Sequence, residues 1–220
     1  MELHQIEADL KNPDFQYRLK AIAALKDYDS EIAVPLLTSK LNDSEFLVRS
    51  FIAMGLGKQQ TAESFAALIR IMKFDDTPNV RAEAANSLSL FGRVAVSHLV
   101  LCFYQDDHWL VRRTILAALV EIGCPHELFD ICVHALKGED PTVQESAVDA
   151  LSSLASSSEH AAALSLLLTL VNAESSRLRV RVAYALKKFS EPQAKEALIQ
   201  LRQDEDHRVV AATLENLLER

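Results

Sequence analysis

The sequence predicts an all-α protein, an α-α superhelix (a right-handed solenoid) built from about six repeats of two helices. A short motif recurs at intervals of 31 to 35 residues, and a second stretch of periodic apolar residues lies between each motif and the next. Of the 220 residues, 49% are hydrophobic, 25% are charged and only five are glycine, which favours a helical protein with a folded core.

The first helix of each repeat carries a Val-Arg pair, and we call it the Val-Arg helix. Six and seven residues after the arginine come a small residue and a leucine, as in VRSFIAMGL. The arginine position is occupied in turn by Arg18, Arg49, Arg81, Arg112, Gln144, Arg179 and Val210. Small residues are expected to let neighbouring Val-Arg helices approach closely: Ala23, Ala53, Ala85, Ala117 and Ala183.

The other helix of each repeat, which we call the second helix, is represented by stretches such as ESFAALIRIMKF and HELFDICVHALK. One pair of amphipathic helices cannot bury its apolar face, whereas a stack of pairs forms a continuous core. The first stack member is a half-repeat (Leu3 to Leu10) and the last is a lone Val-Arg helix. We therefore expect residues 1–220 to form a single solenoid domain.

Carboxylates occur at nearly every junction between a second helix and the next Val-Arg helix. Asp106 and Asp107, in the stretch DDHWLVRRTILAAL, could be taken for a general acid and base. Because similar carboxylates recur at the other junctions, the interpretation we adopt is that they cap the exposed amides of the following helix.

The arginine column has two interpretations. A ladder of ion pairs with acidic junction residues is the structural one, and we adopt it. An anion-binding stripe is the functional one, but Gln144 and Val210 interrupt the column without a reason that this interpretation supplies.

The segments NDSEFLVRSFIAMGL, DDTPNVRAEAANSL and GEDPTVQESAVDAL resemble the HEAT-like repeats named after the E and F subunits of phycobilisome lyase. This resemblance covers most of the chain and implies the solenoid fold. Similar repeats occur in bilin lyases, phycobilisome-degradation (non-bleaching) proteins, hydroxylases and scaffolds. Deoxyhypusine hydroxylase needs several His-Glu pairs, whereas this chain has only His126-Glu127. A HEAT-like DNA glycosylase is disfavoured by the single tryptophan and the acidic surplus.

In solenoids of this type the second helices are expected to line the concave face and to bind partners there. Residues spaced i, i+4 and i+7 interrupt the apolar pattern of these helices, and the central ones have side chains that ligands and metals use. The predicted binding residues are Arg70, Lys73, His98, Cys102, Asp130 and His134, together with Trp109 at a repeat junction. The alternative is a polar groove floor in which Cys102 packs as a small hydrophobe.

The net charge of −8 disfavours nucleic acid as a partner, because phosphate contacts need clustered cations. The start MELHQIEADLKN lacks the pattern of a signal peptide, no apolar run is long enough to cross a membrane, and three cysteines without CxxC spacing indicate reduced thiols. We expect a cytoplasmic scaffold without membrane insertion that docks on a phycobiliprotein and assists bilin handling or phycobilisome turnover. The alternative is a bilin lyase or detachment enzyme. No metal or resident cofactor is expected, and bilin is the one candidate ligand.

Overall fold

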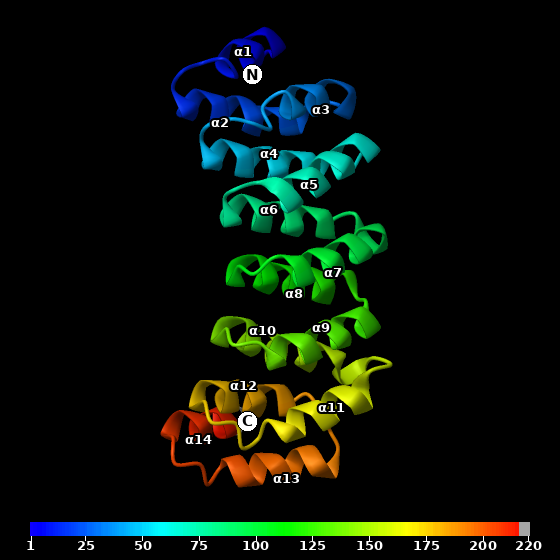
Figure 1. The fold of residues 1–220 in the computed structure, drawn as a ribbon, viewed down its shortest axis with the longest axis vertical. Helices are drawn as coiled ribbons and strands as arrows, with labels where there is room; N and C mark the ends of the chain where they lie inside the picture. The colour runs from blue at the N-terminus through cyan, green and yellow to red at the C-terminus, as the bar shows by residue number, and fades with distance from the viewer. Residues whose placement is uncertain (216–220) are drawn as a thin grey trace. The chain divides into compact units, whose positions relative to one another are not determined.

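The computed structural model describes residues 1–215, and these residues form α-helices joined by short turns, with no strand among them. The predicted all-α class is confirmed, and the helices pack as an α solenoid (Figure 1). Helix contacts divide the chain into two compact units, Met1–Ile122 and Gly123–Arg220. The expectation of one domain over residues 1–220 stays a prediction.

The first unit contains α1 to α8. Its helices are α1 (Leu3–Asp9), α2 (Phe15–Ala24), α3 (Ser30–Thr38), α4 (Phe46–Gln59), α5 (Ala62–Phe74), α6 (Pro78–Ser89), α7 (Val96–Gln105) and α8 (Trp109–Ile122), with 3-10 turns at Leu25–Asp27 and Gly92–Ala95. The even-numbered members from α2 onward are Val-Arg helices, and α3, α5 and α7 are second helices. The predicted half-repeat at the start is the short helix α1.

The second unit contains α9 to α14. Its helices are α9 (Pro125–Lys137), α10 (Pro141–Ser153), α11 (His160–Thr169), α12 (Ser176–Leu186), α13 (Pro192–Leu201) and α14 (His207–Leu214), with a 3-10 turn at Leu154–Ser156. Helices α6, α9, α10 and α13 begin with proline, whose missing N–H is not needed in the first turn. Gly92 and Gly123 supply the positive φ angles of two turns.

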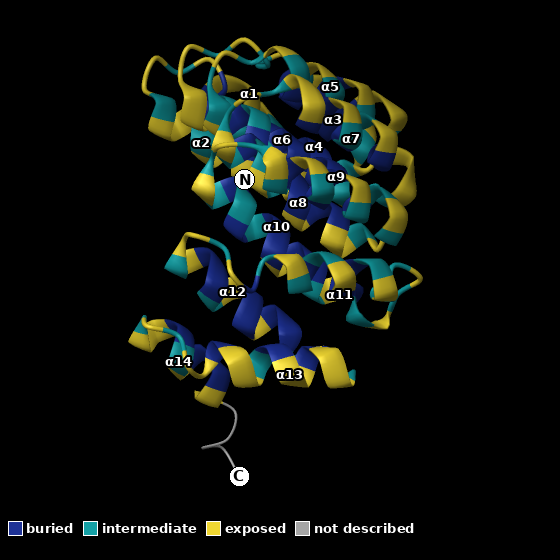
Figure 2. Cartoon of the chain, turned by 60° about the horizontal axis from the view of Figure 1, so that its bottom comes forward, coloured by how far each residue is buried: buried dark blue, intermediate teal, exposed yellow. Residues whose placement is uncertain are grey.

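Buried residues lie between the two helix layers, as the dark blue ribbon shows in Figure 2. In the first unit, Ile52 and Leu56 of α4 and Leu68 of α5 are completely inaccessible to solvent. Close packing continues between successive Val-Arg helices, because a Cβ added to Gly57 of α4 would lie 2.8 Å from Cβ of Ser87 of α6. Glycine is therefore required where these two helices touch.

The predicted contact alanines are partly correct. Ala53, Ala85 and Ala183 are fully buried, as expected. Ala23 and Ala117 are exposed, so their prediction as contact residues is wrong. These two lie one position later relative to the motif arginine, and one residue turns the side chain by about 100° around the helix axis.

Within each unit, successive Val-Arg helices contact one another much more extensively than successive second helices do. A stack whose two layers are unequally spaced curves toward the closely spaced layer. The Val-Arg helices therefore lie on the inner side of each unit, and the second helices on the outer side. The prediction that the second helices line the concave face is wrong within both units, because the close helix contacts are in the other layer.

Candidate functional site

The arginine column forms ion pairs with the junction aspartate of the following repeat. Nε of each arginine lies 2.6 to 2.8 Å from an aspartate oxygen in the pairs Arg18–Asp43, Arg49–Asp75, Arg81–Asp106 and Arg179–Asp204. All eight side chains are largely buried. The predicted ladder of structural ion pairs is confirmed for these four arginines.

Each arginine also binds the backbone of its own junction. Nη1 of Arg49 donates to the carbonyl oxygen of Asp43, and Nη1 of Arg81 donates to that of Asp75, at 2.8 and 2.9 Å. Hydrogen bonding to its aspartate partner raises the pKa of Arg49 and of Arg81. The arginines therefore stay charged and join two consecutive junctions, which leaves them unable to serve as a free anion-binding stripe.

The junction aspartates also fix the turn before each Val-Arg helix. Oδ1 of Asp106 accepts a hydrogen bond from the amide of His108 at 2.9 Å, while Arg81 holds both of its oxygens. Asp43, Asp75 and Asp204 accept equivalent bonds from the amide two residues later. Asp106 is thus a turn-forming residue, as the capping interpretation requires, although the bonded amide precedes the helix rather than lying in its first turn.

Three positions of the aspartate column have no carboxylate. The residue six before Arg18 is Asn12, and the residues six before Gln144 and Arg179 are Gly138 and Ala173, whereas the remaining four repeats carry aspartate there. Gln144 still donates from Nε2 to the carbonyl oxygen of Gly138 at 2.7 Å, which reproduces the backbone half of the arginine contact. The ladder is therefore incomplete around α10.

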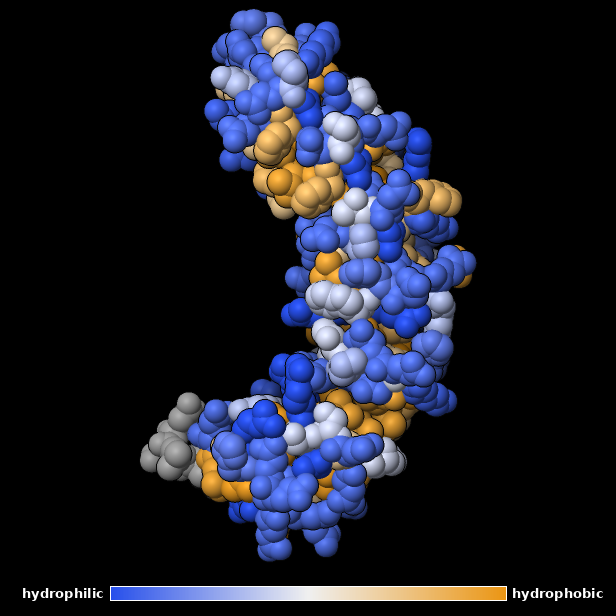
Figure 3. Space-filling view, turned by 60° about the vertical axis from the view of Figure 1, so that its left-hand side comes forward, coloured by the Kyte–Doolittle hydropathy of each residue, from blue (hydrophilic) through white to orange (hydrophobic). Residues whose placement is uncertain are grey.

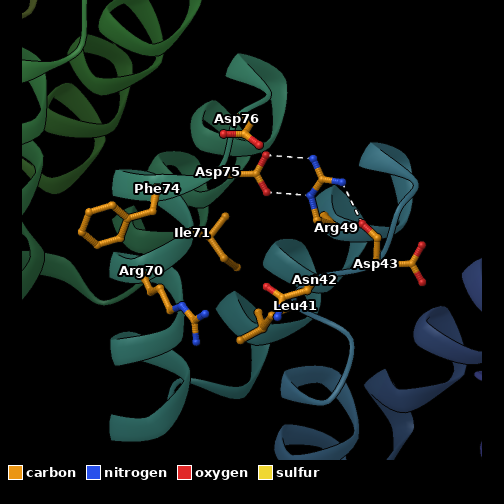
Figure 4. Close-up of a pocket in the computed structure, with 9 residues that line it drawn as sticks. All are labelled: Leu41, Asn42, Asp43, Arg49, Arg70, Ile71, Phe74, Asp75 and Asp76. Carbon is orange, nitrogen blue, oxygen red and sulfur yellow. Dashed lines mark hydrogen bonds and ion pairs between the residues drawn. The ribbon is translucent and has the colours of Figure 1, made fainter.

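Depressions lie beside the ladder between consecutive second helices. The one between α3 and α5 has a volume of about 290 Å³, and Asn42, Arg49, Arg70, Phe74 and Asp75 are among its lining residues (Figure 4). Arg70 extends away from the Arg49–Asp75 pair. A second depression of about 660 Å³ between α5 and α7 is lined by Lys73, Cys102 and Gln105 among others. Three of the predicted binding residues, Arg70, Lys73 and Cys102, thus line these depressions, but the depressions lie in the outer layer of second helices.

Cys102 is not an accessible groove residue. Its exposed fraction is 3%, and burial together with the nearby Asp106 carboxylate raises the pKa of its thiol to about 11. Cys132 is fully buried as predicted, and burial raises the pKa of its thiol to about 12. Both thiols are protonated near neutral pH, and Cys102 packs as a small hydrophobe.

The other predicted binding residues are spread over both units. In the first unit, the ring of His98 packs edge-on against Phe65 with centroids 5.6 Å apart, and Trp109 begins α8, 40% exposed and stacked on His108. In the second unit, Asp130 and His134 are both exposed on α9. Within residues 1–215, no three His, Cys, Asp or Glu side chains form a group that could hold a metal ion. A binding role for these residues stays a prediction.

A stripe of exposed apolar side chains lies elsewhere, on α4 of the first unit. Leu47, Phe51 and Met54 have exposed fractions of 41%, 36% and 39%, and their spacing of four and three residues places them on one face of the helix. Tyr17 on the neighbouring α2 is 44% exposed. Figure 3 shows hydrophobic residues gathered in the upper part of the molecule, where α2 and α4 lie. We call these four residues the α4 patch.

The α4 patch was not predicted from the sequence, because the stripe of buried residues on the same helix obscures its pattern. Val48, Ile52 and Leu56 form the core face, so α4 is apolar on two faces. A helix with two apolar faces normally has both covered. The second stripe at i, i+4 and i+7 was therefore a readable signal that this face of α4 is a contact surface, without telling whether the contact lies within the fold.

A pair of titratable residues in the second unit was also not predicted from the sequence. His160, at the start of α11, bonds through one ring nitrogen to Glu191, which precedes α13, and through the other to the carbonyl oxygen of Ala155. Hydrogen bonding to Glu191 raises the pKa of His160 and lowers the pKa of Glu191. This pair fastens two consecutive second helices together at their N-terminal ends.

Comparisons with known proteins agree with this architecture. The sequence profile of HEAT repeats matches residues 5–89, 35–119 and 154–219. Escherichia coli YibA has a similar structure at 16% identity, with a TM-score of 0.67 over 100% of this chain and 85% of that chain. The complex of CpcE and CpcF of phycocyanin lyase from Nostoc sp. PCC7120 is similar at 21% identity, with a TM-score of 0.55 over 100% of this chain and 88% of that chain. At these identities the likeness shows the fold. A comparison with curated protein sequences finds no match.

Proposed function

Because this chain belongs to the HEAT-repeat family, we propose that it is a protein-binding scaffold whose docking surface is the inner, Val-Arg layer of the first unit. The α4 patch is the observation that supports this proposal. A stripe of Leu47, Phe51 and Met54 beside Tyr17 leaves apolar area in contact with water, and a partner that covered it would gain the free energy of burying that area. Aromatic and methionine side chains are also the types enriched in protein interfaces.

The chemistry of the remaining residues favours binding over catalysis. The ladder aspartates are engaged by arginines and backbone amides, and the Cys102 thiol is buried with a raised pKa. A nucleophilic cysteine needs the opposite, an accessible thiol with a lowered pKa. The rival proposal, a bilin lyase or detachment enzyme, therefore has to depend on His98, Asp130 or His134.

The finer proposal is that the partner is a phycobiliprotein and that docking assists bilin handling or phycobilisome turnover. It is supported by the resemblance of the repeats to those of the phycobilisome lyase subunits and by the fold shared with CpcE and CpcF of phycocyanin lyase. Bilin, held by the partner, would then be the only chromophore involved. A cytoplasmic location is part of this proposal, and within residues 1–215 no helix combines the length and apolar character needed to cross a membrane.

The test is a titration of the purified chain with purified phycocyanin, followed by calorimetry and by the absorption spectrum of the bilin. We expect saturable binding that Phe51→Glu weakens at least tenfold. Ile199→Glu is the matched control, because Ile199 is 56% exposed on α13 in the other unit. Absence of binding would remove the phycobiliprotein from the proposal.

The scaffold proposal itself is tested without naming the partner in advance. A photo-crosslinking residue is placed at position 51 or, as control, at position 199, and the protein captured in native cells is identified, purified and titrated against the chain. We expect capture from position 51 and direct binding of the purified partner that Phe51→Glu weakens. A captured protein that binds Phe51→Glu as tightly as the unaltered chain would contradict the assigned surface.

A further inference from the structure

A narrow apolar slot lies beside the α4 patch, between α2 and α4. It has a volume of about 250 Å³, and its walls include Ile22, Phe51 and Met54. The space exists because Ala23 and Gly55 present almost no side chain there, and Leu37 of α3 forms part of its wall. A Cβ added to Gly55 would lie 3.1 Å from Cδ2 of Leu37. Small-molecule sites span roughly 300–1,000 Å³, so this slot suits a single side chain.

The charges around the slot differ from those around the neighbouring depressions. Lys26 and Lys58 line it, and no carboxylate does. The two depressions beside the ladder in the first unit are each lined by at least two carboxylates, and so is a third one of about 470 Å³ in the second unit, beside Arg179 and Asp204. Lys20, which lies over the ring of Tyr17 at 5.2 Å, adds a third cation next to the α4 patch. None of the three lysines forms an ion pair with another residue in the range 1–215.

We infer that this slot receives one large apolar side chain of a partner segment whose flanking residues are acidic. The inference is based on the proposed scaffold function and adds the chemistry of the partner. The apolar walls favour a leucine, methionine or phenylalanine side chain, because filling them removes apolar area from water on both partners. The unpaired Lys26 and Lys58 then stand at the mouth of the slot, where carboxylates on either side of the inserted residue would pair with them.

The charge pattern favours this occupant over a second copy of the chain or an anionic lipid surface. The chain carries a net charge of −8, so two copies repel each other, and the acidic junctions of the same unit would be repelled by an anionic membrane. A narrow acidic segment avoids both kinds of electrostatic repulsion because it contacts only the lysines around the slot.

The experiment uses three synthetic helical peptides of the same length. The first is glutamate-rich with one central phenylalanine, the second has alanine in place of the phenylalanine, and the third has lysine in place of the glutamates. The methyl NMR signals of Met54 and Leu37 are followed during titration of the full chain, and peptide affinity is measured by fluorescence anisotropy. We expect the first peptide to shift both methyl signals, the alanine peptide to bind at least tenfold more weakly, and the lysine peptide not to bind.

Two variants make the test specific. Lys26→Glu combined with Lys58→Glu is expected to make the chain prefer the lysine peptide over the glutamate peptide. Ala23→Met is expected to fill the slot and weaken binding of the phenylalanine peptide at least tenfold. Lys195→Glu, at an exposed position of α13, is the control that leaves binding unchanged. Equal binding of the glutamate and lysine peptides, or methyl shifts confined to other residues, would overturn the inference.

The other occupants give distinct results. Sedimentation that shows a dimer abolished by Ala23→Met would assign the slot to a second copy and overturn the inference. Binding to phosphatidylglycerol vesicles that is lost in the double lysine variant would assign the lysines to a membrane and overturn it too. Failure of the phycocyanin titration affects only the named partner, since the peptide experiment does not use it.

Discussion

Arg49 holds Asp75, 26 residues later in the chain, through two hydrogen bonds from Nε and Nη2 at 2.7 and 3.0 Å. Both side chains are largely buried, and Asp75 also accepts a hydrogen bond from the amide of Thr77. One carboxylate therefore joins the start of α4 to the junction before α6. The same relationship connects Arg18, Arg81 and Arg179 with their aspartates, so the ladder is the most regular polar feature of the fold.

Removing one carboxylate of the ladder should destabilise the fold. Asp75→Ala leaves the guanidinium of Arg49 largely buried without its charge partner, and the loss of such a partner costs about 2–4 kcal/mol in the free energy of unfolding. The measurement is urea denaturation followed by circular dichroism. Asp76→Ala, at the exposed neighbour, should change the free energy by less than about 0.5 kcal/mol. Equal effects of the two substitutions would contradict the structural role of the ladder.

Introducing the arginine–aspartate pair that the ladder lacks at α10 should stabilise the second unit. Gln144 and Ala173 occupy the arginine and aspartate positions of α10 and of the junction before α12. The double variant Gln144→Arg with Ala173→Asp should form a bidentate pair, with a coupling of about 1–2 kcal/mol in a double-mutant cycle. Each single variant should be neutral or destabilising, because it adds one unpaired charge. A coupling near zero would show that positions 144 and 173 do not face each other as the paired arginines and aspartates of the ladder do.

The His160–Glu191 pair should make stability depend on pH. The pKa of His160 is raised, so its contribution is fully present below its unfolded value of 6.5 and is lost as the pH rises through the folded value. The pKa of Glu191 is lowered, so its contribution is present above its unfolded value of 4.5 and is lost as the pH falls through the folded value. The pair therefore stabilises most between about pH 4.5 and 6.5.

The pair is tested by comparing the unaltered chain with Glu191→Gln in urea denaturation at pH 5.5 and 8.5. The loss of stability should be larger at pH 5.5, where both groups are charged. Glu196→Gln, at an exposed position of α13, is the control and should lose equally little stability at both pH values. A loss that is the same at pH 5.5 and 8.5 would rule out the charged pair.

The Cys102 thiol should be unreactive in the folded chain. Burial raises its pKa to about 11, so very little thiolate exists at pH 8, and attack needs both thiolate and access. Modification by a soluble disulfide reagent, mapped by mass spectrometry, should reach Cys102 at least a hundredfold more slowly in the native chain than in urea. Cys102→Ala should leave partner binding unchanged. Rapid modification of the folded chain at Cys102 would make this cysteine a candidate for a chemical role again.

The helices, their repeat and the ladder could be predicted from the pattern of residues along the chain. Apolar periodicity and the recurrence of Arg49, Arg81 and their counterparts are properties of single helices and of neighbouring repeats, so a regular interval reveals them. The prediction that Asp106 is a turn residue depended on the same regularity, and the structure agrees. Predictions failed where the rotation of one helix decided the outcome, as for Ala117, which is exposed while Ala118 beside it is buried.

Which layer lies inside, and which apolar side chains stay uncovered, depends on how the helices pack in three dimensions. The relative spacing of the two layers depends on how closely backbones approach, as at Gly57 and Ser87, and such contacts join residues about one repeat apart in rotations that periodicity does not fix. Helix packing also buries Cys102 and leaves the slot between Ala23 and Gly55 open. A pattern along one chain specifies which side of a helix is apolar, whereas the packing of three helices determines whether that side finds a neighbour.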